Sequence, residues 1–291
     1  MWPWLFILGL AIGSFINVVA LRYNPEKFIF SQKVIGGRSA CPKCGKKLNW
    51  FELLPLFSFI FLLGRCRSCK EKISWQYPIV ELISGLIFIL IPTLIKTSFL
   101  ELFGANPQNS TSYILYSISY ILIFETLLVV SLIDIRLRLI PDEANLFLIL
   151  LSVPIIIFQK TQFGLVSGSF LGSYAALFGL RGNIWVNHLF ALFFGATFFG
   201  LLIFVTRGRG MGMGDLKLAA ALGAVLGWAD ILLVIALSFI IGSLFSLPSL
   251  LFGKRGLKSL LPFGPFLAIA SVVVFFFGHT IVNLYFKLFP L

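Results

Sequence analysis

Long apolar segments separated by short polar ones run along almost the whole chain. The hydrocarbon core of a bilayer is about 30 Å thick and takes about 20 helical residues to cross. Apolar segments near this length occur eight times, at residues 2–21, 78–95, 112–133, 144–158, 185–205, 215–228, 231–252 and 264–286. The pattern predicts an all-α polytopic membrane protein with about eight transmembrane helices. The Gly- and Ser-rich stretch 163–180 is predicted to be a ninth span or an interfacial or re-entrant element.

The composition agrees with this prediction. Hydrophobic residues make up 59% of the 291 residues and charged residues only 12%, which excludes an ordinary soluble domain. The segment 2–21 has no basic residue before its apolar core and no small-residue cleavage pattern after it. We therefore interpret it as a retained membrane anchor and not as a cleaved signal peptide.

The positions of Lys and Arg predict the orientation, because cytoplasmic loops are enriched in both. Of the 23 basic residues, eleven lie in 22–76, two in 134–142, three in 207–217 and three in 253–262. Eight spans place these four loops on one side, which is then the cytoplasm, and both termini on the other. Topology and anionic lipid headgroups account for the net charge of +12, so the lipid bilayer is a predicted partner and nucleic acid is not.

All four cysteines lie in the first basic loop, about residues 23–76, as the pairs Cys41/Cys44 and Cys66/Cys69 with 21 residues between the pairs. Two CxxC pairs at this spacing predict a tetrahedral thiolate Zn²⁺ site. Two disulfides or four idle thiols are the alternative, and a reducing cytoplasm disfavours disulfides. Four protein ligands close the coordination sphere, so the predicted zinc is structural.

Between the two cysteine pairs lies an apolar piece, residues 51–64. Fourteen residues that include Pro55 are too short to span a bilayer comfortably. We expect this piece to lie on the inner membrane surface or to pack under the metal. Zinc would then hold together a loop that cannot build a hydrophobic core of its own.

Two acidic residues, Asp134 and Asp215, lie at predicted membrane edges. Asp134 ends the third apolar segment, and Asp215 begins the sixth after two glycines in Gly212–Asp215. Acids at membrane depth are unfavourable and are typical of functional sites. Two aspartates from different helices can act as an aspartyl hydrolase, in which one carboxyl is protonated while the other activates water. The glycines would allow close approach of an extended peptide.

Structural roles are the alternative for these acids. Asp215 could cap a helix start, and both aspartates could pair with neighbouring basic side chains such as Lys217. Asp142, directly after Pro141, is interpreted as a helix-start capping residue. Other hydrolase chemistry is not supported, because the chain has two histidines and neither an HExxH nor a GxSxG pattern.

Taken in order, these motifs resemble those of the bacterial type IV prepilin peptidases, membrane aspartyl proteases with a GxGD signature. The resemblance covers essentially the whole chain. Its remaining motifs, besides the paired CxxC loop, are Gly13–Val19 (GSFINVV), Tyr77–Glu81 (YPIVE), the acidic motif ending in Ile140–Asp142 (IPD), Gly212–Asp215 (GMGD) and Pro262–Pro265 (PFGP).

The resemblance implies function. Members of this family cut the basic leader from type IV prepilins and secretion pseudopilins at the cytoplasmic side of the bacterial inner membrane. Many of them then methylate the new N-terminus with S-adenosylmethionine. By resemblance the catalytic pair is Asp134 and Asp215, and Glu81 is a candidate for methyl transfer or for a structural hydrogen bond. Residues 1–96 would form the methyltransferase part and 112–291 a six-helix peptidase part; Glu125 has no implied role.

A transporter or channel with a cytoplasmic zinc module is the alternative function. Intramembrane acids and glycine-interrupted helices would suit ion coupling. No inverted repeat is evident between the two halves of the sequence, however, and the two aspartate motifs differ in kind.

Overall fold

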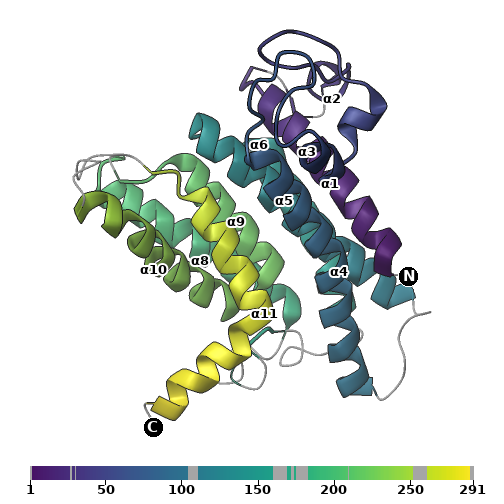
Figure 1. The fold of residues 1–291 in the computed structure, drawn as a ribbon. Helices are drawn as coiled ribbons and strands as arrows, with labels where there is room; N and C mark the ends of the chain where they lie inside the picture. The colour runs from purple at the N-terminus through teal and green to yellow at the C-terminus, as the bar shows by residue number, and fades with distance from the viewer. Residues whose placement is uncertain are drawn as a thin grey trace. The chain divides into compact units, whose positions relative to one another are not determined.

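The computed structural model describes residues 2–26, 28–29, 31–103, 111–159, 169–171, 174, 183–208, 210–251 and 261–288. In these ranges the chain is helix and loop, with two isolated β-bridges and no strand (Figure 1). Six of the described helices are long and apolar enough to cross a membrane. The prediction of an all-α, multi-pass membrane protein is therefore confirmed.

Each of the eight predicted apolar segments coincides with a helix. The helices are α1 (Trp2–Arg22), α4 (Gln76–Phe103), α5 (Thr111–Leu137), α6 (Asp142–Phe158), α8 (Ile184–Val205), α9 (Met213–Leu226), α10 (Asp230–Leu251) and α11 (Gly264–Leu288). Helix α6 has 17 residues and α9 has 14, so neither is among the six candidate spans and eight spans are not confirmed. The predicted element 163–180 lies mostly outside the described residues.

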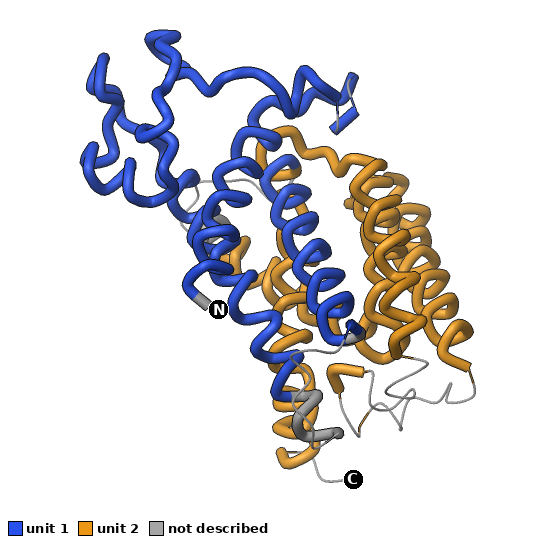
Figure 2. The backbone as a smooth tube through the Cα atoms, turned by 90° about the vertical axis from the view of Figure 1, so that its right-hand side faces the viewer, with its two compact units in different colours: residues 1–133 blue, residues 134–291 orange. Residues whose placement is uncertain are grey.

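The chain divides into two compact units, residues 1–133 and 134–291 (Figure 2). The boundary falls inside α5, so the last turn of that helix belongs to the second unit. A loop with the short helices α2 (Gln32–Ile35), η1 (Trp50–Leu53) and α3 (Phe57–Phe61) connects α1 to α4 in the first unit.

In the first unit, α1 and α4 pack closely through small residues. A Cβ atom added at Gly9 would lie 2.8 Å from the Cα of Gly85, so the two backbones meet where neither residue has a side chain. Near the other end of α1, the buried Asn17 amide donates to the carbonyl oxygens of Gly13 at 3.2 Å and Tyr77 at 3.3 Å. Two of the sequence motifs thus form one helix–helix contact.

In the second unit, α9 packs against α6, α8, α10 and α11. All residues from Ala221 to Leu226 are buried. A Cβ added at Gly195 of α8 would lie 2.6 Å from the carbonyl oxygen of Ala219, and one at Gly223 would overlap the carbonyl of Ala191. The short helix α9 therefore packs against four other helices. Gly195 on α8 and Gly223 on α9 allow these two helices to approach closely.

This packing predicts a position-specific cost of adding one methyl group. Gly223→Ala should lower the melting temperature of the purified protein in detergent, because overpacking a tight interior costs about 1–3 kcal/mol. Gly200→Ala on α8 is the matched control, since its Cβ would lie 3.5 Å from the flexible Leu216 side chain, an ordinary contact. Equal melting temperatures for the two variants would contradict the close α8–α9 packing.

Candidate functional site

Asp134 lies in the last turn of α5 and is buried. Its Oδ2 accepts a hydrogen bond of 2.9 Å from the backbone N–H of Gly264, the first residue of α11. The first N–H groups of a helix lack partners within it and favour an anionic acceptor. A Cβ on residue 264 would lie 2.8 Å from this same oxygen, so glycine is required for the carboxyl to reach the amide.

Asp215 lies in the first turn of α9. Its Oδ2 accepts a 3.1 Å hydrogen bond from the N–H of Gly212, the residue that precedes the helix. The capping role considered for Asp215 is therefore present in the structure. It holds the carboxyl in place at the helix start and is compatible with a chemical role.

A shared neighbour, Ile140, relates the two aspartates of the second unit. Ile140 lies against Gly214, in the segment that carries Asp215, and against Gly264, whose N–H holds Asp134. A Cβ at Gly214 would lie 3.2 Å from the Ile140 Cβ, and a Cβ at Gly264 would lie 3.4 Å from the Ile140 Cδ1. Backbone amides thus position both carboxyls, and carboxyls are the groups that acid–base hydrolysis by an aspartyl pair uses.

The interpretation of Asp142 as a capping residue is corrected by the structure. Helix α6 begins at Asp142 and its N-cap is Pro141, so Asp142 lies in the first turn and is not the capping residue. The Asp142 carboxylate instead accepts two hydrogen bonds of 2.8 Å from the Lys217 ammonium on α9. Both side chains are largely exposed, so this pair links α6 to α9 with a small free-energy contribution.

Ile140 and Gly264 are the residues that the sequence left without a role. Both lie in motifs that the sequence singles out, but neither carries a functional group. Only their contacts with Gly214 and Asp134 show that they position the acidic pair.

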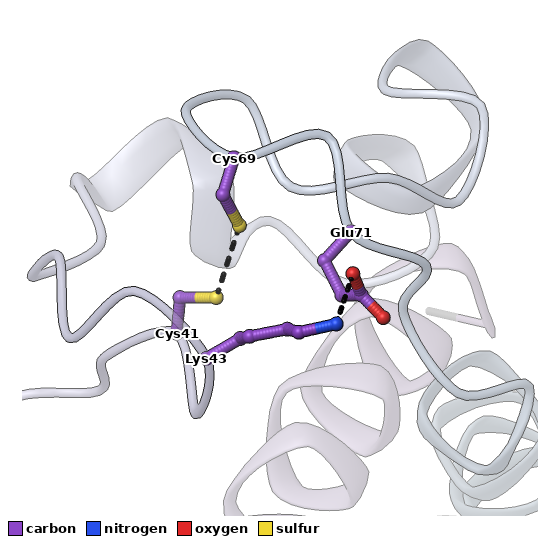
Figure 3. Close-up of polar contacts among 4 residues, drawn as sticks. All are labelled: Cys41, Lys43, Cys69 and Glu71. Carbon is purple, nitrogen blue, oxygen red and sulfur yellow. Dashed lines mark hydrogen bonds and ion pairs between the residues drawn. The ribbon is translucent and has the colours of Figure 1, made fainter.

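The four cysteines come together in the first unit. Their sulfur atoms all lie within 4.8 Å of one another, and Cys41 Sγ is 3.8 Å from Cys69 Sγ (Figure 3). Tetrahedral zinc with Zn–S distances of about 2.3 Å requires sulfur–sulfur distances of about 3.8 Å. The thiols therefore fit a metal ion, and none of them forms a disulfide.

The two CxxC segments have the same backbone design. In each, the first cysteine donates its N–H to a carbonyl five residues later, Cys41 to Lys46 at 3.0 Å and Cys66 to Glu71 at 2.8 Å. In each, the residue after the second cysteine has a positive φ, +69° at Gly45 and +57° at Lys70. We call these two segments the knuckles.

Backbone amides lower the pKa of the first cysteine in each knuckle. Hydrogen bonds from the backbone of Cys44 and Lys43 lower the pKa of Cys41 to about 6, and those from Cys69 and Ser68 lower the pKa of Cys66. Thiolates are the form that binds zinc. An ion pair of 2.7 Å between Lys43 and Glu71 also connects the knuckles (Figure 3).

Two buried acids of the first unit, Glu81 and Glu125, make internal contacts. Glu81 accepts a 2.8 Å hydrogen bond from the N–H of Leu56, which has a φ of +59°. This bond ties the apolar piece 51–64 to α4. Glu125 accepts a 2.8 Å hydrogen bond from the Ser84 hydroxyl. The structural hydrogen bond considered for Glu81 is therefore present, and its donor is the Leu56 N–H.

The apolar piece itself forms η1 and α3, not a membrane span. Its large side chains are exposed, including Phe57 at 58%, Ile60 at 65% and Phe61 at 79%. Its placement on the membrane surface stays a prediction.

Comparison with known proteins gives matches in both units. Residues 7–95 match the family model described as the bacterial peptidase A24 N-terminal domain, and residues 121–247 match that of the type IV leader peptidase family. Three relatives, each called a prepilin leader peptidase/N-methyltransferase, come from Bacillus subtilis, Aeromonas hydrophila and Pseudomonas aeruginosa. They are 29%, 30% and 31% identical, over 98%, 97% and 96% of this chain and 97%, 94% and 91% of their own. No solved structure matches the chain.

The knuckle geometry predicts opposite effects of exchanging residues at the two equivalent positions. Gly45→Ala should speed the loss of bound zinc to a chelator, because a positive φ costs a residue with a Cβ about 1 kcal/mol or more. No atom lies within 4 Å of that added Cβ, so the strain acts alone. Lys70→Gly should slow the loss by relieving the same strain. Chelator competition followed with a zinc dye measures both rates, and equal rates in all three proteins would contradict the geometry.

Proposed function

Because the chain belongs to the type IV leader peptidase family, we propose that it cleaves the short basic leader from type IV prepilins and pseudopilins. We propose further that it methylates the new N-terminus. The observation that carries the proposal is the acidic pair itself. Asp134 and Asp215 lie far apart in the sequence, end and begin different helices, and are each held by a glycine N–H.

The acidic pair supports peptide hydrolysis by acid–base chemistry. One carboxylate removes a proton from water, whose oxygen attacks the carbonyl carbon of the scissile peptide bond. The other carboxyl donates its proton to the carbonyl oxygen, which gives a tetrahedral diol. Collapse of the diol breaks the C–N bond, and a proton returns to the leaving amine. Two carboxyls close together favour this division of roles, because like charges disfavour ionisation of both.

Glycine positions support binding of the substrate in an extended form. Gly212 and Gly214 precede Asp215, and neither presents a side chain to a peptide backbone. Peptide bonds in a helix are shielded, so a membrane protease must take its substrate unwound. An extended chain then finds partners in exposed backbone groups, as in strand addition.

The proposed methyl transfer belongs to residues 1–96, and peptide hydrolysis to 112–291. S-adenosylmethionine would supply the methyl group. Glu81 is held by the Leu56 N–H in the first unit, which supports a positioning role in the loop more than contact with the transferred group. We therefore assign no step of methyl transfer to Glu81.

We propose that Cys41, Cys44, Cys66 and Cys69 hold one structural Zn²⁺. The fit of the sulfur distances to tetrahedral zinc and the paired knuckle geometry support this assignment. When bound, the ion neutralises the thiolates and cross-links the knuckles. The loop 23–76 has little hydrophobic core besides a few buried residues such as Val34, so the metal would determine its order.

The proposed location is the bacterial inner membrane, with the acidic pair and the zinc loop on the cytoplasmic side and both termini outside. The distribution of Lys and Arg supports this orientation. The transporter alternative is not favoured, because both family models and the relatives point to leader peptidases.

Loss of either member of the acidic pair should abolish cleavage. Asp134→Asn and Asp215→Asn each remove one of two carboxyls that must act together, and single losses of such residues commonly cost several orders of magnitude in rate. The assay is incubation of the purified protein with a prepilin, followed by mass spectrometry for a loss the size of the leader.

Asp142→Asn serves as the control for this experiment. It keeps the size of the side chain and weakens only an exposed ion pair with Lys217, so most of the cleavage activity should remain. A dead Asp142→Asn together with an active Asp134→Asn would show that the wrong member of the first motif has been chosen.

Removal of the metal should separate the two activities. Cys66→Ser removes one thiolate ligand and should reduce zinc from one per chain to a substoichiometric amount, measured by elemental analysis. Methylation of the cleaved product should fall more than cleavage does, because the knuckles lie in the first unit and the acidic pair in the second. Equal loss of both activities at unchanged melting temperature would argue against this division.

A further inference from the structure

The first turns of α6 contain one buried amide that the proposed mechanism does not use. Asn145 is only 4% exposed, and neither its Nδ2 nor its Oδ1 has a hydrogen-bond partner. The other buried polar side chain of this fully described helix, Ser152, donates to the Ile149 carbonyl at 2.6 Å. Buried amides normally have partners, and one without them calls for an explanation.

Asn145 lies beside the acidic motif in the chain and in space. It follows Asp142 by three residues, which places it about one helical turn along α6, and its backbone N–H faces the Pro141 carbonyl at 3.4 Å. This end of α6 is fixed to the start of α9 by the Asp142–Lys217 pair, and α6 packs along α9.

The groups that already hold the acidic pair are occupied. The N–H of Gly264 is bonded to Asp134 and that of Gly212 to Asp215. An extended peptide bound here would need further partners, because each backbone group removed from water without a partner is unfavourable. A primary amide offers an N–H donor and a C=O acceptor together, which matches the two groups of a peptide bond.

We propose that Asn145 is a substrate-binding residue whose side-chain amide pairs with the backbone of the extended prepilin segment at the cleavage site. The inference rests on the proposed peptidase function. The partner it names is a main-chain peptide group, so Asn145 recognises an unwound chain and not a particular leader side chain.

The test measures KM and kcat for a synthetic prepilin peptide with the full-length protein in detergent. Asn145→Leu keeps nearly the same volume and removes the amide. It should raise KM on the order of tenfold, the effect of one lost hydrogen bond at the strong end, and leave kcat largely unchanged. The melting temperature should not fall, because an unpaired polar group has been replaced by an apolar one. Ser152→Ala is the matched control and should leave KM unchanged.

A second arm identifies the partner group. Peptides in which one amide near the cleavage site is replaced by an ester lose a single N–H donor. With the natural protein, the ester at the contacted position should raise KM; with Asn145→Leu the same ester should add no further increase, because the partner is already gone. If Asn145→Leu does not fold, the same KM and kcat measurements are made with Asn145→Ala.

The outcomes separate the two proposals. Absence of cleavage by the natural protein would overturn the peptidase function. Normal cleavage together with an unchanged KM in the Asn145 variants would overturn only the role of Asn145. The same holds if the ester raises KM equally with the natural protein and with Asn145→Leu.

Discussion

The second unit depends on one constraint, the close approach of the α9 backbone to its neighbours. Helix α9 has only 14 residues and is surrounded by α6, α8, α10 and α11. Glycine at positions 195 and 223 removes the side chains that would otherwise separate α8 from α9. Because α9 begins at Met213, this packing also determines where Asp215 lies. Overpacking inside the bundle would therefore reach the acidic pair through the helix that carries it.

Backbone amides, more than side chains, position the chemistry. The N–H groups of Gly212 and Gly264 hold one carboxyl each at the start of a helix, where unpaired donors and the helix dipole favour negative charge. The metal loop uses the same device, since main-chain N–H groups lower the pKa of Cys41. Main-chain groups of helices and turns are fixed by the fold, so they hold these ionisable groups without side-chain reorganisation.

The two units divide the sequence motifs between them. The N-terminal family match, residues 7–95, lies in the first unit, where Asn17 and Tyr77 form one contact and Glu81 secures the apolar piece at Leu56. The acidic pair lies in the second. The motifs of this chain thus serve helix packing and loop order as well as positioning of the acidic pair, and Glu81 illustrates how a buried acid can hold a loop in place.

The sequence by itself determined the helices, the four cysteines that cluster and the two aspartates at helix ends. A long apolar segment specifies a helix where backbone groups must pair within the segment. CxxC spacing specifies a knuckle. An acidic residue at a predicted membrane edge is uncommon, so the sequence alone identifies it as a candidate site residue. Tertiary structure decided what those patterns do not encode. It showed that Asp142 pairs with Lys217, that Ile140 and Gly264 position the acidic pair, and that Asn145 is buried without a partner. The reason is physical: these roles come from contacts between segments distant in the chain, and no local periodicity or spacing records which residue of another helix lies opposite.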